Sequence, residues 1–153
     1  MLLRASLITT ASPDAVLGHV AQLDDYPTWM SLVHSARREA DSTPPAWNVE
    51  LRARVGPLAR SKRLRMVRTE YAVGDTSRIV FERSETDGRR HAAWRLEATV
   101  GPVRPAAGTA VDGRTELVMT LSYDGRFFVS VVESVLRQNV EAGRKRLAEL
   151  LAG

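Results

Sequence analysis

Three histidines and no cysteine are the only side chains of the kinds that most often bind transition metals or act as nucleophiles in this sequence. His19, His34 and His91 do not occur in an H-x-x-x-H or H-E-x-x-H arrangement, which would place two imidazoles on one helical face. The G-x-S-x-G motif of a strand-to-helix nucleophile is also missing. We therefore predict no metal site, no thiolate chemistry, no disulfide and no cofactor, and we assign no catalytic residue.

Four polar residues have positions that could direct them toward a buried ligand. Arg68 and Arg83 alternate with apolar residues in two predicted strands, Tyr123 ends a third, and Asn139 lies near the apolar stripe of the last predicted helix. Guanidinium, phenol and amide groups orient ligands through hydrogen bonds. The alternative is structural, because an arginine at a strand end can extend its charge into water and Asn139 can lie at the edge of the stripe.

Apolar and polar residues alternate through the middle of the sequence, with the period of two that is typical of half-buried strands. The segments "WNVELRARV", "HAAWRLEATV" and "TELVMTLSY" show it most clearly. The turn segments "DSTPP", "VGPL", "VGDTS" and "TDGRR" are too short for crossover helices, which favours an antiparallel meander. The predicted strands are 3–10, 47–55, 61–69, 78–85, 91–100 and 115–123.

Helical patterns lie on both sides of this meander. Ser12 and Pro13 form a helix start, in which serine caps and proline occupies the first turn, and predict a helix over 13–22. A second short helix is predicted around 26–33. Both are too short to be stable without packing against the rest of the chain.

The last predicted helix, 126–151, carries an apolar stripe along one face. Gly143 lies beside this stripe, where a glycine costs about 1 kcal/mol relative to alanine. Either it marks a close approach of the helix to the sheet, or it is tolerated near a fraying end.

Length and composition indicate one globular domain, 1–153, in which 44% of the residues are hydrophobic. No run of eighteen apolar residues and no secretory signal occurs, so we expect a cytoplasmic protein. The net charge is +4, and only Lys62 and Lys145 of the 22 basic residues are lysine. The densest basic run, "ARSKRLR", has no interleaved aromatic residues, so we predict no nucleic-acid binding; transient contact with an anionic membrane stays open. The pattern makes no prediction of oligomeric state.

The segment "DYPTWMSLV" concentrates bulky apolar surface near the start of a chain that has only 6% aromatic residues. It contains Tyr26 and Trp29, each of which removes a large area from water when buried. We expect both rings either to plug the core or to border the mouth of a cavity.

The order of elements is α+β, with a sheet whose apolar face must be covered by the long last helix. Together with "ASPDAVLGHVAQLDDYPTWMSLV" and "VVESVLRQNVEAGRKRLAELL", this order resembles the START-like helix-grip superfamily (SRPBCC), which includes polyketide cyclase/dehydrase-like and Bet v 1-like proteins. Within it, "VELRARVGPLARSKRLRMV" is similar to the proteins grouped as the G-type subunit of carbon monoxide dehydrogenase. The resemblance implies a curled antiparallel sheet of about six or seven strands wrapped on the last helix, two short helices after the first strand, and a mostly apolar cavity.

The main hypothesis is a carrier or sensor that binds a hydrophobic small molecule, such as a lipid, a quinone or a polyketide-like compound, between sheet and helix. One alternative is an aromatase/cyclase-like enzyme acting on a ligand in the same cavity, and another is an interaction module with a packed interior. The candidate ligand-binding residues are Tyr26, Trp29, Trp47, Leu51, Met66, Phe81, Arg83, Trp94, Met119, Tyr123, Phe128, Val132, Val135 and Asn139.

Overall fold

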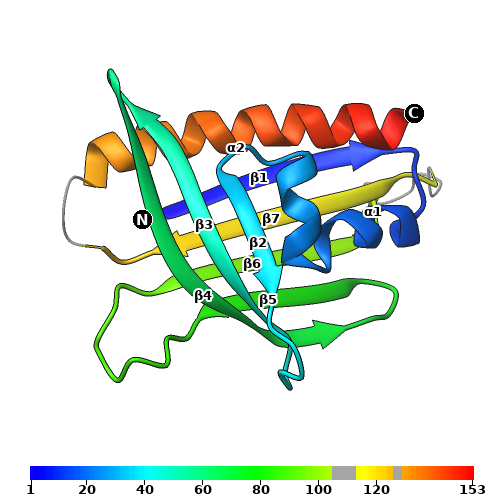
Figure 1. Ribbon diagram of the computed structural model, residues 1–153. Coiled ribbons are helices and arrows are strands. Elements are labelled where there is room, and N and C mark those ends of the chain that lie inside the picture. Colours follow the sequence, from blue (N-terminus) through cyan, green and yellow to red (C-terminus); the bar gives the residue numbers. More distant parts are fainter. Residues whose placement is uncertain (105–112, 126–128) are drawn as a thin grey trace.

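A computed structural model describes residues 1–104, 113–125 and 129–153, the last range without the side chains of 129–132. The described residues form seven strands and three helices (Figure 1). In chain order these are β1 (Leu2–Thr9), α1 (Pro13–Val20), the 3-10 helix η1 (Leu23–Thr28), β2 (Val33–Arg38), β3 (Ala46–Val55), β4 (Leu58–Ala72), β5 (Ser77–Arg83), β6 (Trp94–Pro102), β7 (Thr115–Tyr123) and α2 (Val129–Ala152).

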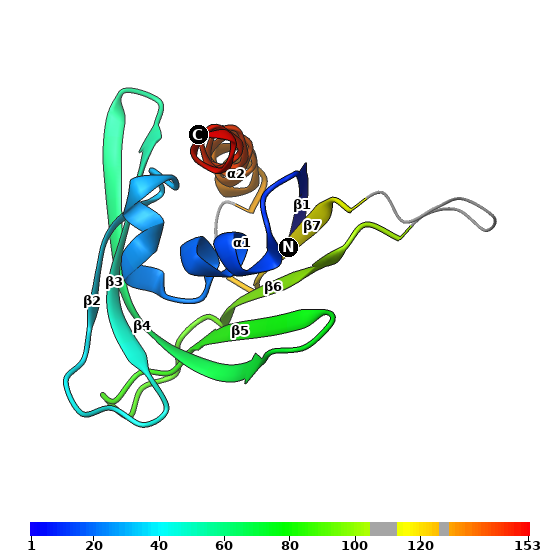
Figure 2. The ribbon, with the colours of Figure 1, turned by 90° about the vertical axis from the view of Figure 1, so that its right-hand side faces the viewer.

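The strands form one antiparallel sheet in the order β1-β7-β6-β5-β4-β3-β2. The sheet bends around α1, η1 and α2, which all lie on its concave side (Figure 2). The register shifts between Arg68 and Glu70 in β4 and between Val33 and Ser35 in β2, and such irregularities increase strand bending. The curled sheet wrapped on a long C-terminal helix confirms the predicted helix-grip architecture.

The N-terminal helix begins as predicted. The Ser12 side chain accepts a hydrogen bond from the Ala15 amide at 3.2 Å, and Pro13 occupies the first turn. Val16, Leu17 and Val20 are buried. The cap and the apolar spacing therefore fix both the start of α1 and the face that it turns inward.

The second short helix differs from its prediction around 26–33. It is a 3-10 helix that ends at Thr28, and Val33 already begins β2. Pro27 lies inside it and has no amide hydrogen, which suits a short 3-10 turn better than a continuing α-helix. We call residues 23–32 the η1 segment; it places Tyr26 and Trp29 over the inner face of the sheet.

Gly143 marks a close approach, but to the η1 segment and not to the sheet. A Cβ at this position would lie 2.6 Å from Met30 Cε and 3.4 Å from the Trp29 carbonyl oxygen. Because non-bonded carbon atoms prefer about 3.5–4.0 Å, only glycine fits without a shift of Met30. This contact sets the distance between α2 and the residues that follow η1.

Candidate functional site

A cavity of about 100 Å³ lies between the inner face of the sheet, the η1 segment and α2. Every strand except β5 contributes to its wall. The wall residues are Leu3, Ala5, Ser6, Leu7, Leu23, Tyr26, Trp29, Met30, Leu32, Val33, Val49, Leu51, Leu64, Met66, Trp94, Leu96, Leu117, Met119, Leu121, Val140, Arg144 and Leu147.

Aliphatic and aromatic side chains make up most of this wall, as expected for a site that binds apolar molecules. Among the described wall residues, only Tyr26 and Arg144 are titratable. The Arg144 guanidinium is held by Glu141, with Nη2 to Oε1 at 2.6 Å. No histidine, aspartate or glutamate belongs to the described wall, so general acid–base chemistry has few groups available there.

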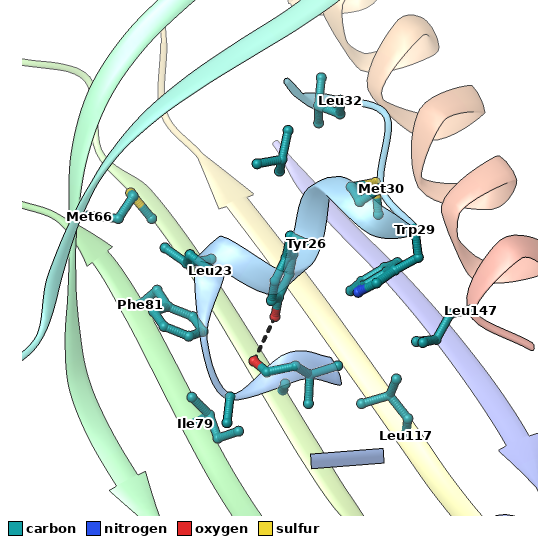
Figure 3. Packing of buried hydrophobic residues seen from close by; sticks show 14 of the residues in the cluster. Leu23, Tyr26, Trp29, Met30, Leu32, Met66, Ile79, Phe81, Leu117 and Leu147 are labelled. Carbon is teal, nitrogen blue, oxygen red and sulfur yellow. Dashed lines mark hydrogen bonds between the residues drawn. The ribbon is translucent and has the colours of Figure 1, made fainter. Parts of the chain in front are cut away.

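Tyr26 lies at the centre of the η1 segment and is almost completely buried. Its hydroxyl donates a hydrogen bond to the Val20 carbonyl oxygen at 2.9 Å, which links η1 to the end of α1 (Figure 3). Its ring lies between Phe81, at a centroid distance of 6.3 Å, and Trp29, at 4.8 Å. Burial raises the pKa of the phenol, so Tyr26 is neutral at physiological pH and acts as a structural donor.

The three tryptophans differ in how their indole nitrogens are satisfied. Trp29 Nε1 donates to the His19 carbonyl oxygen at 3.2 Å, and Trp47 Nε1 donates to Asp24 Oδ1 at 2.7 Å. Trp94 is 6% exposed, and its Nε1 has no hydrogen-bond partner in the described parts of the chain. Since Trp94 belongs to the cavity wall, the wall includes one residue with an unsatisfied N–H donor.

Six of the predicted ligand-binding residues lie in the wall: Tyr26, Trp29, Leu51, Met66, Trp94 and Met119. Trp47 and Phe81 face inward, but they pack against each other at a centroid distance of 5.5 Å and lie outside the wall. The η1 segment covers them, with Tyr26 in edge contact with Phe81. Alternation along a strand gave the correct face for both, although not what lies above it.

Three of the polar candidates lie outside the described wall and have partners of their own. Arg83 Nε donates to Glu85 Oε1 at 2.9 Å at the end of β5, with a side chain that is 7% exposed. The Asn139 amide donates to the Val135 carbonyl oxygen at 2.8 Å, within α2. Tyr123 packs its ring on Trp94, with the centroids 4.5 Å apart.

The remaining candidates occupy other parts of the structure. Arg68 Nη1 donates to the Ala21 carbonyl oxygen at 2.9 Å, and its guanidinium lies 4.3 Å from the Tyr71 ring centroid. Val135 is partly buried in α2 but is not a wall residue. Phe128 and the side chain of Val132 lie outside the described residues.

Other wall residues were not among the sequence candidates. Leu64, Leu96 and Leu121 alternate with predicted wall residues on their strands, so the same pattern could have identified them. Met30 and Leu32 follow η1 in a stretch without periodicity, and only the structure reveals them.

Methionine is unusually frequent around the cavity. Met30, Met66 and Met119 are three of the four methionines of the chain, and all three belong to the wall. The unbranched thioether side chain has several accessible rotamers and fills irregular space. The wall can therefore change shape at these positions with little strain.

Comparison with known proteins places this geometry in a family. A family model described as "Polyketide cyclase / dehydrase and lipid transport" matches residues 3–152. The chain belongs to this family. A comparison with curated proteins finds no match.

Solved structures of this fold resemble the chain over nearly its whole length. A START superfamily protein from Mycobacterium smegmatis has a TM-score of 0.68 and 15% identity, covering 99% of this chain and 97% of that one. The Zhui aromatase/cyclase from Streptomyces sp. R1128 has a TM-score of 0.64 and 15% identity, covering 99% and 93%. Ara h 8.0201 has a TM-score of 0.61 and 11% identity, covering 99% and 97%.

These matches confirm the predicted resemblance to the START-like superfamily. At such low identity they show a shared fold, and the narrower similarity to the G-type subunit of carbon monoxide dehydrogenase stays a prediction. In the described ranges, no group of three metal-binding side chains lies close enough together to hold an ion. No helix among these residues is long and apolar enough to cross a membrane.

Proposed function

We propose that this protein binds a hydrophobic small molecule in the cavity between the sheet and α2, as a carrier or sensor. The observation that carries the proposal is the apolar wall, whose two described titratable groups, Tyr26 and Arg144, already have partners within the chain. Burial of an apolar ligand there would contribute about 25 cal/mol per Å² of area removed from water. The family, described as including lipid transport, supports this role.

The size of the cavity limits what it can hold without rearrangement. Its volume of about 100 Å³ is smaller than the engineered apolar cavity of roughly 150 Å³ that binds benzene. Drug-sized ligands occupy pockets of about 300–1,000 Å³. A lipid, quinone or polyketide-like ligand would therefore require the wall to expand, and Met30, Met66 and Met119 provide side chains suited to such movement.

The alternative is an aromatase/cyclase-like enzyme that uses the same cavity. It is supported by the family description and by the similarity of the fold to the Zhui aromatase/cyclase. The described wall favours the binding role, because acid–base catalysis needs a titratable group within hydrogen-bond reach of the substrate. Turnover of a candidate polyketide by the purified protein would support the enzyme and contradict a purely binding function.

Thermal shift with a panel of lipids, quinones and small aromatic compounds tests the proposal. Any compound that binds the folded state raises the melting temperature in proportion to the logarithm of its excess over Kd. Leu121→Trp should abolish the shift by filling the cavity, whereas Ser122→Trp, the adjacent position on the other face of β7, should retain it. No shift with any compound would support the interaction module and contradict the binding role.

The β3–β4 hairpin supports a second part of the proposal, namely transient contact with an anionic membrane during loading. The hairpin projects beyond the body of the molecule (Figure 1), and Leu58 near its tip is 54% exposed. Arg54, Arg60 and Lys62 have no ion-pair partner in the described ranges. Each basic residue near an anionic surface contributes about 1 kcal/mol.

Vesicle co-sedimentation separates this contact from a general effect of charge. Arg54→Glu with Lys62→Glu should release the protein from phosphatidylserine vesicles at low salt. Arg89→Glu with Arg90→Glu changes the net charge by the same amount away from the hairpin and should retain binding. Equal release by both pairs, or equal binding to phosphatidylcholine vesicles, would contradict a specific role of the hairpin.

A further inference from the structure

We infer that the indole N–H of Trp94 donates a hydrogen bond to an oxygen atom of the bound ligand, so that the preferred ligands are neutral apolar molecules with a carbonyl group. This inference rests on the proposed binding function and adds a chemical class of ligand and a residue that selects it. Neither the family description nor the fold neighbours assign such a role to this position.

The contrast with the other two tryptophans is the first step. Trp29 and Trp47 are buried, and both donate to an oxygen of the chain, at 3.2 Å and 2.7 Å respectively. Trp94 is buried to a similar extent, yet its Nε1 has no acceptor among the residues that the structure describes. More than nine in ten buried polar groups in proteins have a partner, so an unpaired donor requires an explanation.

The position of Trp94 suggests where that partner comes from. Trp94 is the first residue of β6 and belongs to the wall, together with Leu96 on the same strand. Its neighbour across the ladder is Tyr123, and Leu121 lies two residues further along β7. The indole is thus placed at the side of the cavity, where a ligand occupies space that the chain leaves empty.

Water is a poor candidate for this partner. A buried water molecule typically needs two to four polar groups around it, and the described wall around Trp94 is apolar. A ligand oxygen differs because the rest of its molecule is stabilised by the apolar wall. One hydrogen bond from Trp94 then satisfies both the ligand oxygen and the indole.

The remaining polar groups of the wall narrow the class of ligand. The Tyr26 hydroxyl is bound to Val20, and the Arg144 guanidinium is bound to Glu141. Ser6 is exposed. A carboxylate would therefore enter an apolar site without a free cation in the described wall, which is unfavourable. A neutral carbonyl matches a single N–H donor.

Acetophenone and α-methylstyrene provide a matched test, because a C=CH2 group replaces C=O in an otherwise identical frame. Both should bind the wild-type protein in fluorescence or calorimetric titration. Trp94→Phe should weaken acetophenone roughly fivefold, about 1 kcal/mol, and change α-methylstyrene by less than twofold. An equal change for both ligands, or no change for either, would overturn the inference while leaving the binding function intact.

A second measurement needs no variant of the binding residue and stays decisive if Trp94→Phe does not fold. In ¹H–¹⁵N spectra of the wild-type protein, acetophenone should shift the Trp94 indole signal downfield, and α-methylstyrene should not. The Trp29 and Trp47 signals serve as internal references because their donors are already bound. Identical responses to the two ligands overturn the inference, and failure of both to bind contradicts this inference and the proposed cavity function together.

Discussion

Gly143→Ala should reduce ligand affinity with little effect on stability. The added Cβ would lie 2.6 Å from Met30 Cε and 2.9 Å from its Sδ. Because carbon atoms prefer about 3.5–4.0 Å, the end of the Met30 side chain must move by roughly 1 Å. Met30 lies between α2 and the cavity, so the displaced methyl group enters the space for the ligand.

Two opposing effects determine the stability of this variant. Alanine is favoured over glycine in a helix by about 1 kcal/mol. A methionine forced away from its preferred rotamer costs about 0.5–1.5 kcal/mol. The free energy of unfolding should therefore stay within about 1 kcal/mol of the wild type. Losing room for one methyl group, at about 0.8 kcal/mol per CH2, should weaken α-methylstyrene binding about fourfold.

Urea denaturation and ligand titration measure the two quantities, and Gly18→Ala is the matched control. No atom lies within 4 Å of a Cβ at Gly18 in α1, so this variant should be stabilised by up to about 1 kcal/mol with unchanged binding. In a Met30→Ala background, Gly143→Ala should also stabilise and should no longer affect binding. A loss of more than about 3 kcal/mol, or unchanged binding in the wild-type background, would refute the proposed displacement of Met30.

Two further predictions concern stability. Tyr26→Phe leaves the buried Val20 carbonyl without its donor and should cost about 1–3 kcal/mol in urea denaturation, and a cost near zero would show that water replaces the hydroxyl. The pKa of Glu97 is lowered by hydrogen bonds from Arg78 and Arg95, so its contribution is present above its unfolded pKa of about 4.3 and is lost as the pH falls through the lower folded value. Between pH 7 and pH 3, Glu97→Gln should therefore lose less stability than the wild type, and equal losses would contradict this role.

The fold was largely predictable because its signals are local. The Ser12 cap, the alternation along β3, β6 and β7, and the apolar stripe of the last helix each specify an element and the face that it buries. The extent of η1 was not predictable to the same degree. Whether a proline-containing turn continues as an α-helix depends on what it packs against, and here the chain must reach β2 by Val33.

The candidate site was only partly predictable, for a related reason. Alternation shows which side of a strand faces inward, but cannot show which part of that side the η1 segment covers. Trp47 and Phe81 face inward and are covered, whereas Trp94 and Met119 face inward and line the cavity. The unpaired indole of Trp94 also has no sequence signal, because it depends on acceptors contributed by distant parts of the chain.

Native mass spectrometry of the protein purified from its own host tests the central claim most directly. The account predicts a co-purifying neutral apolar molecule with a carbonyl group, released by denaturation and lost in the Leu121→Trp variant. Recovery of empty protein only, together with no stabilisation by lipids, quinones or acetophenone, would contradict it.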